Sequence, residues 1–256
     1  MQSPYQLLTS TRYDPFLATQ GWNDDDRGPS PFFLLRSHLE RLISAAETHN
    51  WVYAVSVLKY GTLKGCCVDA ISEQRIRGST SAAFRLRITV SAEGIIAATA
   101  TPLPAQFTVD PMHLSVASPP IAPPPTLNIY LDRLPVKPSV FTRTKTSFRD
   151  VYDQVKVRNE DQWVSSADEG IGWDVLMYNT DDQIMEATIF NVAFYRDGKW
   201  TTPSAKTGCL PGVMRKWLLD SGRIQEDLEE LLTPDSLQDG ELVLLFNGVQ
   251  GCSRHW

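Results

Sequence analysis

The stretch "SPPIAPPP", from Ser118 to Pro125, sets the organisation of this chain. Each proline lacks an amide hydrogen and restricts the residue before it, so the stretch can form neither a regular helix nor a central strand. We therefore expect a linker at residues 118–125, with a first lobe over residues 1–117 and a second over residues 126–256. A chain of 256 residues can bury a substantial core in two such lobes.

The patterns on both sides of this linker predict an α/β fold of the α+β type. In the first lobe we expect a strand in "YQLLTSTRY", a helix in "FFLLRSHLERLISAAE" and a hairpin from "AAFRLRITVS" and "IIAATAT". In the second lobe we expect helices beginning near Ser147 and at "VMRKWLLDSG". The strands expected there are "TLNIYLD", "WDVLMYN", "IMEATIFNVAFYR" and "ELVLLFN".

Charge and hydropathy exclude several classes of partner. A net charge of -6 and a pI near 5.3 argue against nucleic acid, because phosphate backbones attract basic surfaces. No apolar run approaches the roughly 20 residues of a spanning helix, and the start "MQSPYQLLTSTRYDP" lacks the plan of a signal peptide. We therefore expect a cytoplasmic protein that contacts neither nucleic acid nor membrane.

The cysteines and histidines show no spacing typical of a metal site. Cys66 and Cys67 are adjacent, Cys209 and Cys252 stand alone, and the four histidines are scattered. We expect buried free thiols and no metal. The sequence also lacks HExxH, GxSxG, Walker and GxGxxG patterns, which removes the usual arguments for zincins, serine hydrolases, P-loop enzymes and dinucleotide-binding oxidoreductases.

One set of residues in the second lobe suggests a particular chemistry. Lys145, in "VFTRTKTSFRDVY", is expected to open a helix, and Glu186 is expected on a strand. A helix start at "LPGVMR" and a glycine-rich turn at "FNGVQG" would both offer backbone amides to a phosphate. A lysine amine can form a Schiff base with an aldehyde, and a carboxylate can hold a pyridine nitrogen protonated. Together these are the requirements of pyridoxal 5'-phosphate.

The order of these motifs resembles one known family. "LLTSTRYDP", "HLERL", "RLRITVSAEG", "KTSFRDVYDQVKVR", "IMEATIFNVAFY", "LPGVMR" and "FNGVQG" are similar, over nearly the whole chain, to fold-type-IV pyridoxal-phosphate enzymes of the class IV aminotransferase family. Within that family, "KTSFRDVYDQVKVR" looks most like the fungal aminodeoxychorismate lyases. The resemblance implies a smaller N-terminal lobe, a larger C-terminal lobe with a mixed, β-barrel-like sheet, and a homodimer.

The resemblance also implies roles for single residues. Lys145 would be the Schiff-base lysine and general base, Glu186 would pair with the pyridine nitrogen, and Arg41 would grip the cofactor phosphate. The backbone amides completing the phosphate cup would be those of Val213, Met214, Gly248 and Val249. Weaker candidates for the cofactor's surroundings or the substrate's carboxylates are Arg12, Arg87, Arg149 and Tyr152.

Each of these residues also has a plainer interpretation from the sequence alone. Lys145 could be a solvated charge in a helix's first turn, and Glu186 an outward-facing strand residue. Arg41 could be a helix-surface arginine, and "LPGVMRKW" would start a helix in any case because proline suits a first turn. The functional roles therefore depend on the set as a whole.

Three functions stay open at this point. The resemblance favours a 4-amino-4-deoxychorismate lyase that releases 4-aminobenzoate and pyruvate, as in folate biosynthesis. The alternative is a class IV aminotransferase acting on a small amine or amino acid, which needs a keto acid as acceptor. The third is a non-catalytic binding protein of the same fold. Gln250 stands where related lyases often carry an arginine, which leaves the substrate's carboxylate anchors open.

Overall fold

The computed structural model describes residues 4–25, 28–104, 110–112, 127–164 and 172–255. The predicted linker at residues 118–125 lies outside these ranges. The chain divides into two compact units, which are described separately. The first unit comprises Met1–Asp110, Thr144–Phe148 and Gly248–Gln250, and the second comprises Pro111–Arg143, Arg149–Asn247 and Gly251–Trp256. Two short segments from the later half of the chain, each with a predicted site residue, thus belong to the first unit.

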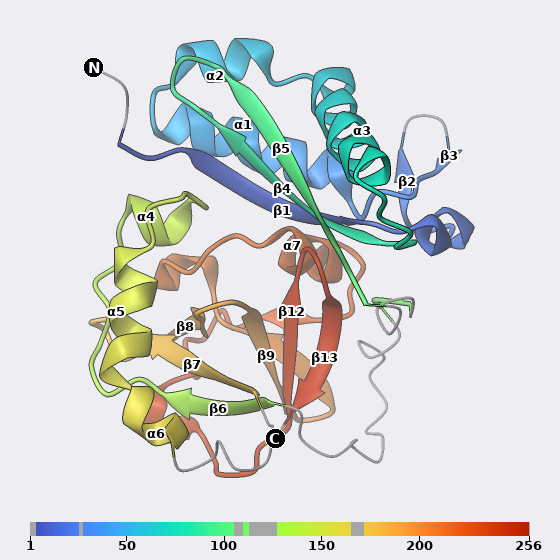
Figure 1. Ribbon diagram of the computed structural model, residues 1–256. Helices are drawn as coiled ribbons and strands as arrows, with labels where there is room; N and C mark the ends of the chain where they lie inside the picture. The colour runs from blue at the N-terminus through green and yellow to red at the C-terminus, as the bar shows by residue number, and fades with distance from the viewer. Residues whose placement is uncertain (1–3, 26–27, 105–109, 113–126, 165–171, 256) are drawn as a thin grey trace. The chain divides into compact units, whose positions relative to one another are not determined.

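The first unit contains a three-stranded antiparallel sheet. Its central strand β4 (Phe84–Val90) pairs with β1 (Leu7–Tyr13) on one side and with β5 (Ile96–Pro102) on the other (Figure 1). Alternate side chains of β4 are fully buried, which is the pattern of a strand with one face on the core. The predicted first strand and the predicted hairpin are confirmed, with Gly94 in a left-handed conformation (φ +81°) at the reversal.

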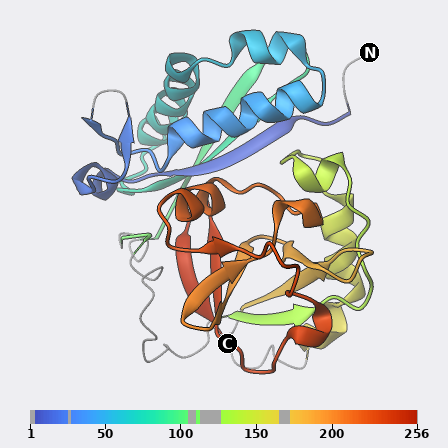
Figure 2. The ribbon, with the colours of Figure 1, turned by 180° about the vertical axis from the view of Figure 1, so that it is seen from behind.

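Helices cover one face of this sheet, as Figures 1 and 2 show for α1 and α3. Helix α1 (Leu35–Thr48) packs on β1, and α3 (Tyr60–Ile76) packs on β5. The predicted α1 is confirmed, whereas α3 and the short α2 (Val52–Val57) were not predicted. The remaining elements are the 3₁₀ helix η1 (Pro15–Thr19) and the small hairpin of β2 (Asp24–Asp25) and β3 (Gly28–Pro29).

The segment that carries Lys145 is extended and lies along β1. Leu8 donates its amide to the carbonyl of Lys145 at 2.8 Å, and Ser147 donates to the carbonyl of Gln6 at 2.8 Å. An antiparallel bridge joins Leu7 to Thr146. The expectation that Lys145 opens a helix is therefore wrong, because β1 takes the backbone groups that a helix would need. The next helix begins only at Asp150.

The second unit contains a mixed three-stranded sheet. Strand β6 (Leu127–Leu131) runs parallel to β7 (Gly172–Tyr178), which pairs antiparallel with β8 (Ile184–Ala187). Helix α5 (Asp150–Arg158) packs on β7, as Figure 1 shows. Two short helices flank it in sequence, α4 (Val140–Arg143) and α6 (Glu160–Val164).

A five-stranded mixed sheet completes the second unit, with the strand order β11-β10-β9-β12-β13. Its strands are β9 (Asn191–Arg196), β10 (Lys199–Thr202), β11 (Gln225–Glu226), β12 (Val243–Asn247) and β13 (Gly251–His255). The predicted helix α7 (Val213–Asp220) packs on β12. The short 3₁₀ helices are η5 (Ala205–Thr207) and η6 (Pro234–Ser236). The final strand β13 was not predicted. Within the described residues, no helix combines the length and apolar character needed to cross a membrane.

The segment "IMEATIFNVAFYR" was predicted as one strand and forms two. Strand β8 ends at Ala187 and β9 begins at Asn191, so the chain passes from one sheet to the other at residues 188–190. The carboxylate of Asp174, from β7, accepts hydrogen bonds from the Thr188 hydroxyl and the Ile189 amide. A buried acid on a neighbouring strand therefore supplies the acceptors that hold this reversal.

Candidate active site

The polar groups of the first unit form a cluster around Thr9 on β1. The Thr9 hydroxyl accepts a hydrogen bond from Nη2 of Arg41 at 2.6 Å. It also lies 2.6 Å from Nδ1 of His38. Both partners belong to α1 and are three residues apart, which places them on one face of that helix. Arg41 is half-buried and Thr9 is fully buried, so one guanidinium nitrogen is fixed by the interior of the unit.

His38 shows which charges surround this cluster. Its pKa is lowered well below 6.5, first by burial and then by the positive charges of Arg41 and, more weakly, Lys145. The backbone of Gly248 acts in the opposite direction. The first unit therefore brings Arg41, Lys145 and Gly248 to the same buried ring. These are three of the residues that the sequence predicted for the site.

The turn at residues 248–250 joins β12 to β13. A Cβ atom on Gly248 would lie 2.6 Å from Cε1 and 2.9 Å from Nε2 of His38, so only glycine allows the turn to lie this close to the ring. Gly251, which follows, has a φ of +79° and lies against Pro111. The left-handed Gly251 is the first residue of β13 and pairs with Asn247 across the turn. The turn presents the backbone of Gly248 and Val249 at the end of the hairpin.

The polar groups of the second unit form a cluster around Glu186 on β8. Oε1 of Glu186 accepts hydrogen bonds from the Tyr152 hydroxyl at 3.0 Å and from the Leu210 amide at 3.0 Å. Oε2 accepts one from Nδ2 of Asn191 at 3.1 Å. The residue is only 3% exposed, so these three donors are what makes a buried carboxylate tolerable. They also fix its orientation.

Tyr152 therefore contacts the acid. Its side chain is buried, and burial together with the Glu186 carboxylate raises the pKa of its phenol well above 10. Because the hydroxyl stays protonated, it can only donate to Glu186 across the physiological pH range. Asn191 has a related role that the sequence did not reveal. Its amide also donates to the carbonyl of Leu210 at 2.9 Å and so links β9 to the segment before α7.

The start of α7 is held by the same amide. A Cβ on Gly212, the residue before the helix, would lie 1.9 Å from Oδ1 of Asn191, so no larger residue fits. The amides of Val213 and Met214 belong to the first turn, where helix N–H groups have no partner within the helix. Such amides, at the positive end of the helix dipole, suit a phosphate. The carboxylate cluster and this helix start are therefore adjoining parts of one unit.

The weaker arginine candidates have different surroundings. Arg12 is buried, with its guanidinium 3.7 Å from the Asp14 carboxylate and over the Phe33 ring. Burial lowers the pKa of Arg12, and the Asp14 charge opposes this. Arg149 donates to the carbonyl of Thr188 at 3.0 Å and lies over the ring of Tyr152. Arg87 is exposed on β4. None of these contacts identifies a substrate anchor.

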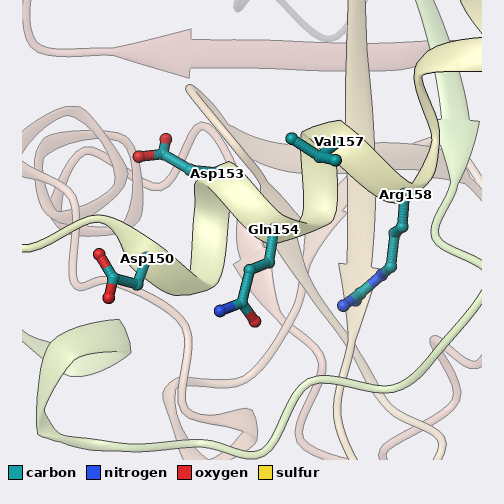
Figure 3. A pocket seen from close by; sticks show the side chains of 5 residues that line it. All are labelled: Asp150, Asp153, Gln154, Val157 and Arg158. Carbon is teal, nitrogen blue, oxygen red and sulfur yellow. The ribbon is translucent and has the colours of Figure 1, made fainter.

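A surface hollow of about 530 Å³ lies along α5 in the second unit. Figure 3 shows its lining side chains, which are Asp150, Asp153, Gln154, Val157 and Arg158. Arg158 is engaged with the Asp132 carboxylate. Since the residues predicted to hold the cofactor are absent from its lining, this hollow is separate from the two clusters described above.

The comparisons with known proteins agree with the resemblance noted in the sequence. Residues 26–254 match the family described as amino-transferase class IV, and the chain belongs to that family. In overall fold it is similar to the crystal structure of a "Putative amino-acid aminotransferase" from Mesorhizobium loti, with a TM-score of 0.66 and 24% identity. That likeness covers 98% of this chain and 99% of the other, and it confirms the expected fold class.

Two curated relatives are fungal. The chain is 47% identical over 106 residues to the "Putative aminodeoxychorismate lyase" of Schizosaccharomyces pombe, which is 41% of this chain and 43% of that one. It is 36% identical over 133 residues to the "Aminodeoxychorismate lyase" of Saccharomyces cerevisiae, which is 47% of this chain and 34% of that one. The matches thus span less than half of either relative's length.

Proposed function

We propose that this chain is a pyridoxal-phosphate-dependent 4-amino-4-deoxychorismate lyase that releases 4-aminobenzoate and pyruvate. The observation that supports the reaction best is the 47% identity to the fission yeast relative of that name. The observation that supports the cofactor best is the pair of polar clusters. One unit carries a lysine, an arginine and a glycine turn, and the other carries a buried carboxylate beside a helix start.

The residues present fit the cofactor in two respects. A phosphate dianion needs several donors, and Arg41 with the amides at Gly248, Val249, Val213 and Met214 provides the donor types that phosphates bind. The two glycines at these places, Gly248 and Gly212, allow no Cβ, so backbone rather than side chain is presented there. A protonated pyridine nitrogen needs an oriented carboxylate, and Glu186 is held in place by three donors.

The chain's own residues would act as follows. When bound, pyridoxal phosphate supplies an aldehyde and an electron-withdrawing ring that accepts the electron pair left when the carbon bearing the amine loses its proton. Lys145 would hold the aldehyde covalently at rest and, once displaced by the substrate amine, take up that proton at Nζ. Glu186 would stabilise the positive charge on the ring nitrogen. Arg41 and the backbone amides would keep the phosphate end fixed.

The substrate has a leaving group beside the deprotonated carbon. Loss of the ring proton breaks the bond to the enolpyruvyl oxygen, the ring becomes aromatic, and the departing enolpyruvate takes up a proton to become pyruvate. No external oxidant or keto acid is required. The substrate also carries two carboxylates, which need cationic or amide anchors. Arg87, which is exposed on β4, is one residue of the right charge.

The test is to incubate the purified protein with enzymatically generated aminodeoxychorismate, with and without a keto acid. We expect 4-aminobenzoate and pyruvate in equal amounts in both samples. Product formation only with the keto acid would replace the lyase by a class IV aminotransferase. A colourless protein whose spectrum is unchanged by pyridoxal phosphate would instead indicate a non-catalytic binding protein.

We propose further that the protein is a cytoplasmic homodimer. The location is supported by four cysteines without disulfides, which is usual in a reducing compartment. The dimer follows from the family resemblance, in which a partner subunit closes part of each site. A monomeric sedimentation profile at working concentration would contradict the dimer.

A further inference from the structure

The first unit contains a buried polar chain that runs from Arg41 through Thr9 and His38 to Gly248. Thr9 and His38 are each fully buried, and the Thr9 hydroxyl lies 2.6 Å from both the arginine and the imidazole. A buried histidine is costly unless its ring nitrogens are hydrogen-bonded. The role that the family resemblance implies for Arg41 does not explain its hydrogen bond to Thr9. Nor does it explain the hydrogen bond between Thr9 and the buried His38.

The directions of these hydrogen bonds follow from the arginine. A guanidinium can only donate, so the Thr9 oxygen accepts from Arg41, and the Thr9 proton is left to donate elsewhere. A neutral imidazole accepts at one nitrogen, and Nδ1 is the nitrogen that faces Thr9. The ring proton is then on Nε2, on the side of Gly248. This assignment requires a neutral ring, because a protonated one has no acceptor.

The surroundings keep the ring neutral. Burial is the largest cause of its lowered pKa, and the charges of Arg41 and Lys145 act in the same direction. The backbone of Gly248 acts against them but does not reverse the lowering of the pKa. His38 is thus held in the one state that can accept from Thr9 and donate on its far side.

The far side of the ring supports the turn. A Cβ on Gly248 would come within 2.6 Å of the ring, and within 3.3 Å of the carbonyl of Ser10, so the turn rests directly on His38 and β1. One ring therefore contacts the threonine that holds Arg41 and also lies against Gly248 of the turn. Nδ1 of His38 is hydrogen-bonded to Thr9, which accepts from Arg41 and so fixes its position. The opposite edge of the ring limits how closely the glycine turn can approach.

We propose that His38 is a positioning residue for the cofactor phosphate: through Thr9 it sets the direction of Arg41, and by contact it places the turn at residues 248–250. This inference rests on the proposed cofactor. It predicts that the Thr9–His38 pair contributes to the recognition of the phosphate group but not to capture of the aldehyde, which belongs to Lys145.

The experiment compares the affinities of the apoprotein for pyridoxal phosphate and for pyridoxal, which lacks the phosphate. Both are followed by the absorbance change on covalent capture. We expect wild-type protein to prefer pyridoxal phosphate strongly. Thr9→Val keeps the shape and removes the hydroxyl, so it should lower the affinity for pyridoxal phosphate by about 10-fold or more and leave that for pyridoxal within about two-fold. His38→Leu should do the same.

Two matched variants complete the design. Thr9→Ser keeps a hydroxyl at this position and should keep the preference for the phosphorylated form. His49→Leu removes another histidine of the first unit, whose Nε2 lies 2.8 Å from the Thr144 hydroxyl beside Lys145. Because that histidine is on the aldehyde side, its loss should change both affinities by the same factor and leave their ratio unchanged.

The outcomes separate this inference from the proposed function. Wild-type protein that captures neither compound overturns the function. Wild-type protein that prefers pyridoxal phosphate, with the same preference kept in Thr9→Val, overturns the role of His38 and leaves the function standing. If His38→Leu fails to fold, as judged by circular dichroism, Thr9→Val decides the question alone.

Discussion

The two polar clusters are built on opposite principles. In the first unit, the positive charges of Arg41 and Lys145 act on His38, which stays neutral. Arg41 donates to Thr9, which in turn is hydrogen-bonded to the buried His38 ring. In the second unit, a single negative group, Glu186, receives three hydrogen bonds from neutral donors. One cluster presents donors and the other presents a fixed acceptor.

This difference indicates that the two clusters bind different parts of the proposed cofactor. Donors and a lysine suit the phosphate and aldehyde of the proposed cofactor, while an oriented carboxylate suits its ring nitrogen. Changes in the first cluster should therefore weaken binding of the phosphate, and loss of Lys145 should abolish capture of the aldehyde. Disruption of the second should leave capture intact and lower turnover. The four predictions below test this contrast, beginning with the largest effect.

Lys145→Ala should abolish covalent capture of the aldehyde by the first cluster. We expect no pyridoxyl adduct after borohydride treatment and a fall in turnover of about 1000-fold or more, because both the covalent anchor and the general base are lost. Peptide mapping of the reduced wild-type protein locates the adduct. Lys199→Ala, at an exposed position on β10, is the control and should remain fully labelled. An adduct at another lysine in the wild-type protein would sink the assignment.

Glu186→Gln should distinguish the roles of the two clusters most clearly, because it changes turnover and leaves capture intact. Borohydride should still trap an adduct at Lys145, whereas turnover should fall by about 100-fold because the ring nitrogen loses its negative partner. The amide can no longer accept from all three donors, so we also expect a loss of about 1–2 kcal/mol in the free energy of unfolding. Activity equal to wild type would remove Glu186 from the mechanism.

Tyr152→Phe should weaken the second cluster by one donor. The two remaining hydrogen bonds keep Glu186 in place, so turnover should fall only about 10-fold, as expected for one hydrogen bond to a charged group. Tyr53→Phe removes a hydroxyl from a side chain that is 73% exposed and serves as the control. A steady-state assay of both variants is sufficient, and a Tyr152→Phe enzyme as active as the control would contradict the role.

The pH dependence of stability should report on His38. In the unfolded chain its ring takes up a proton near pH 6.5, but the folded ring, with its lowered pKa, stays neutral. The unfolded state thus binds more protons as pH falls below 6.5, and the free energy of unfolding falls by up to about 1.4 kcal/mol per pH unit. This loss should stop once the pH passes below the folded pKa.

The measurement is the difference between wild-type protein and His38→Gln in denaturant unfolding from pH 7.5 to 5. His49, whose pKa is also lowered by burial, contributes equally to both proteins and cancels. Parallel curves for the two proteins would mean that His38 takes up a proton as readily in the fold as in the unfolded chain, so its ring would not be held neutral for Thr9.

Local patterns in the sequence were enough to predict most of the elements that carry the site. The stretch before the first turn-rich segment predicted β1, alternation and a glycine predicted the β4–β5 hairpin, helical spacing predicted α1, and the proline in "LPGVMR" favoured a helix start at α7. Helix α3 was missed because its apolar spacing is irregular and glycines interrupt it at Gly61 and Gly65. These are successes and failures of short-range signals.

What the sequence could not supply depends on contacts between distant residues. The reversal after Glu186 has no glycine or proline and is held by Asp174 from another strand. Lys145 is extended because β1, more than 130 residues earlier, takes its backbone groups. The sequence did place His38 three residues before Arg41, on the same face of the predicted helix. Its hydrogen bond to Thr9 is seen only in the structure.

The pairing of β1 with the Lys145 segment has a consequence for the folding of the first unit. In the sheet order β1-β4-β5, strand β1 lies at one edge, and residues 145–147 cover that edge. A chain cut before Thr144 would leave the amide of Leu8 and the carbonyl of Gln6 without these partners. Such an exposed edge strand can pair with other chains and aggregate. During synthesis this edge is covered only once residues 145–147 have been made, so Lys145 belongs to the segment that closes the sheet.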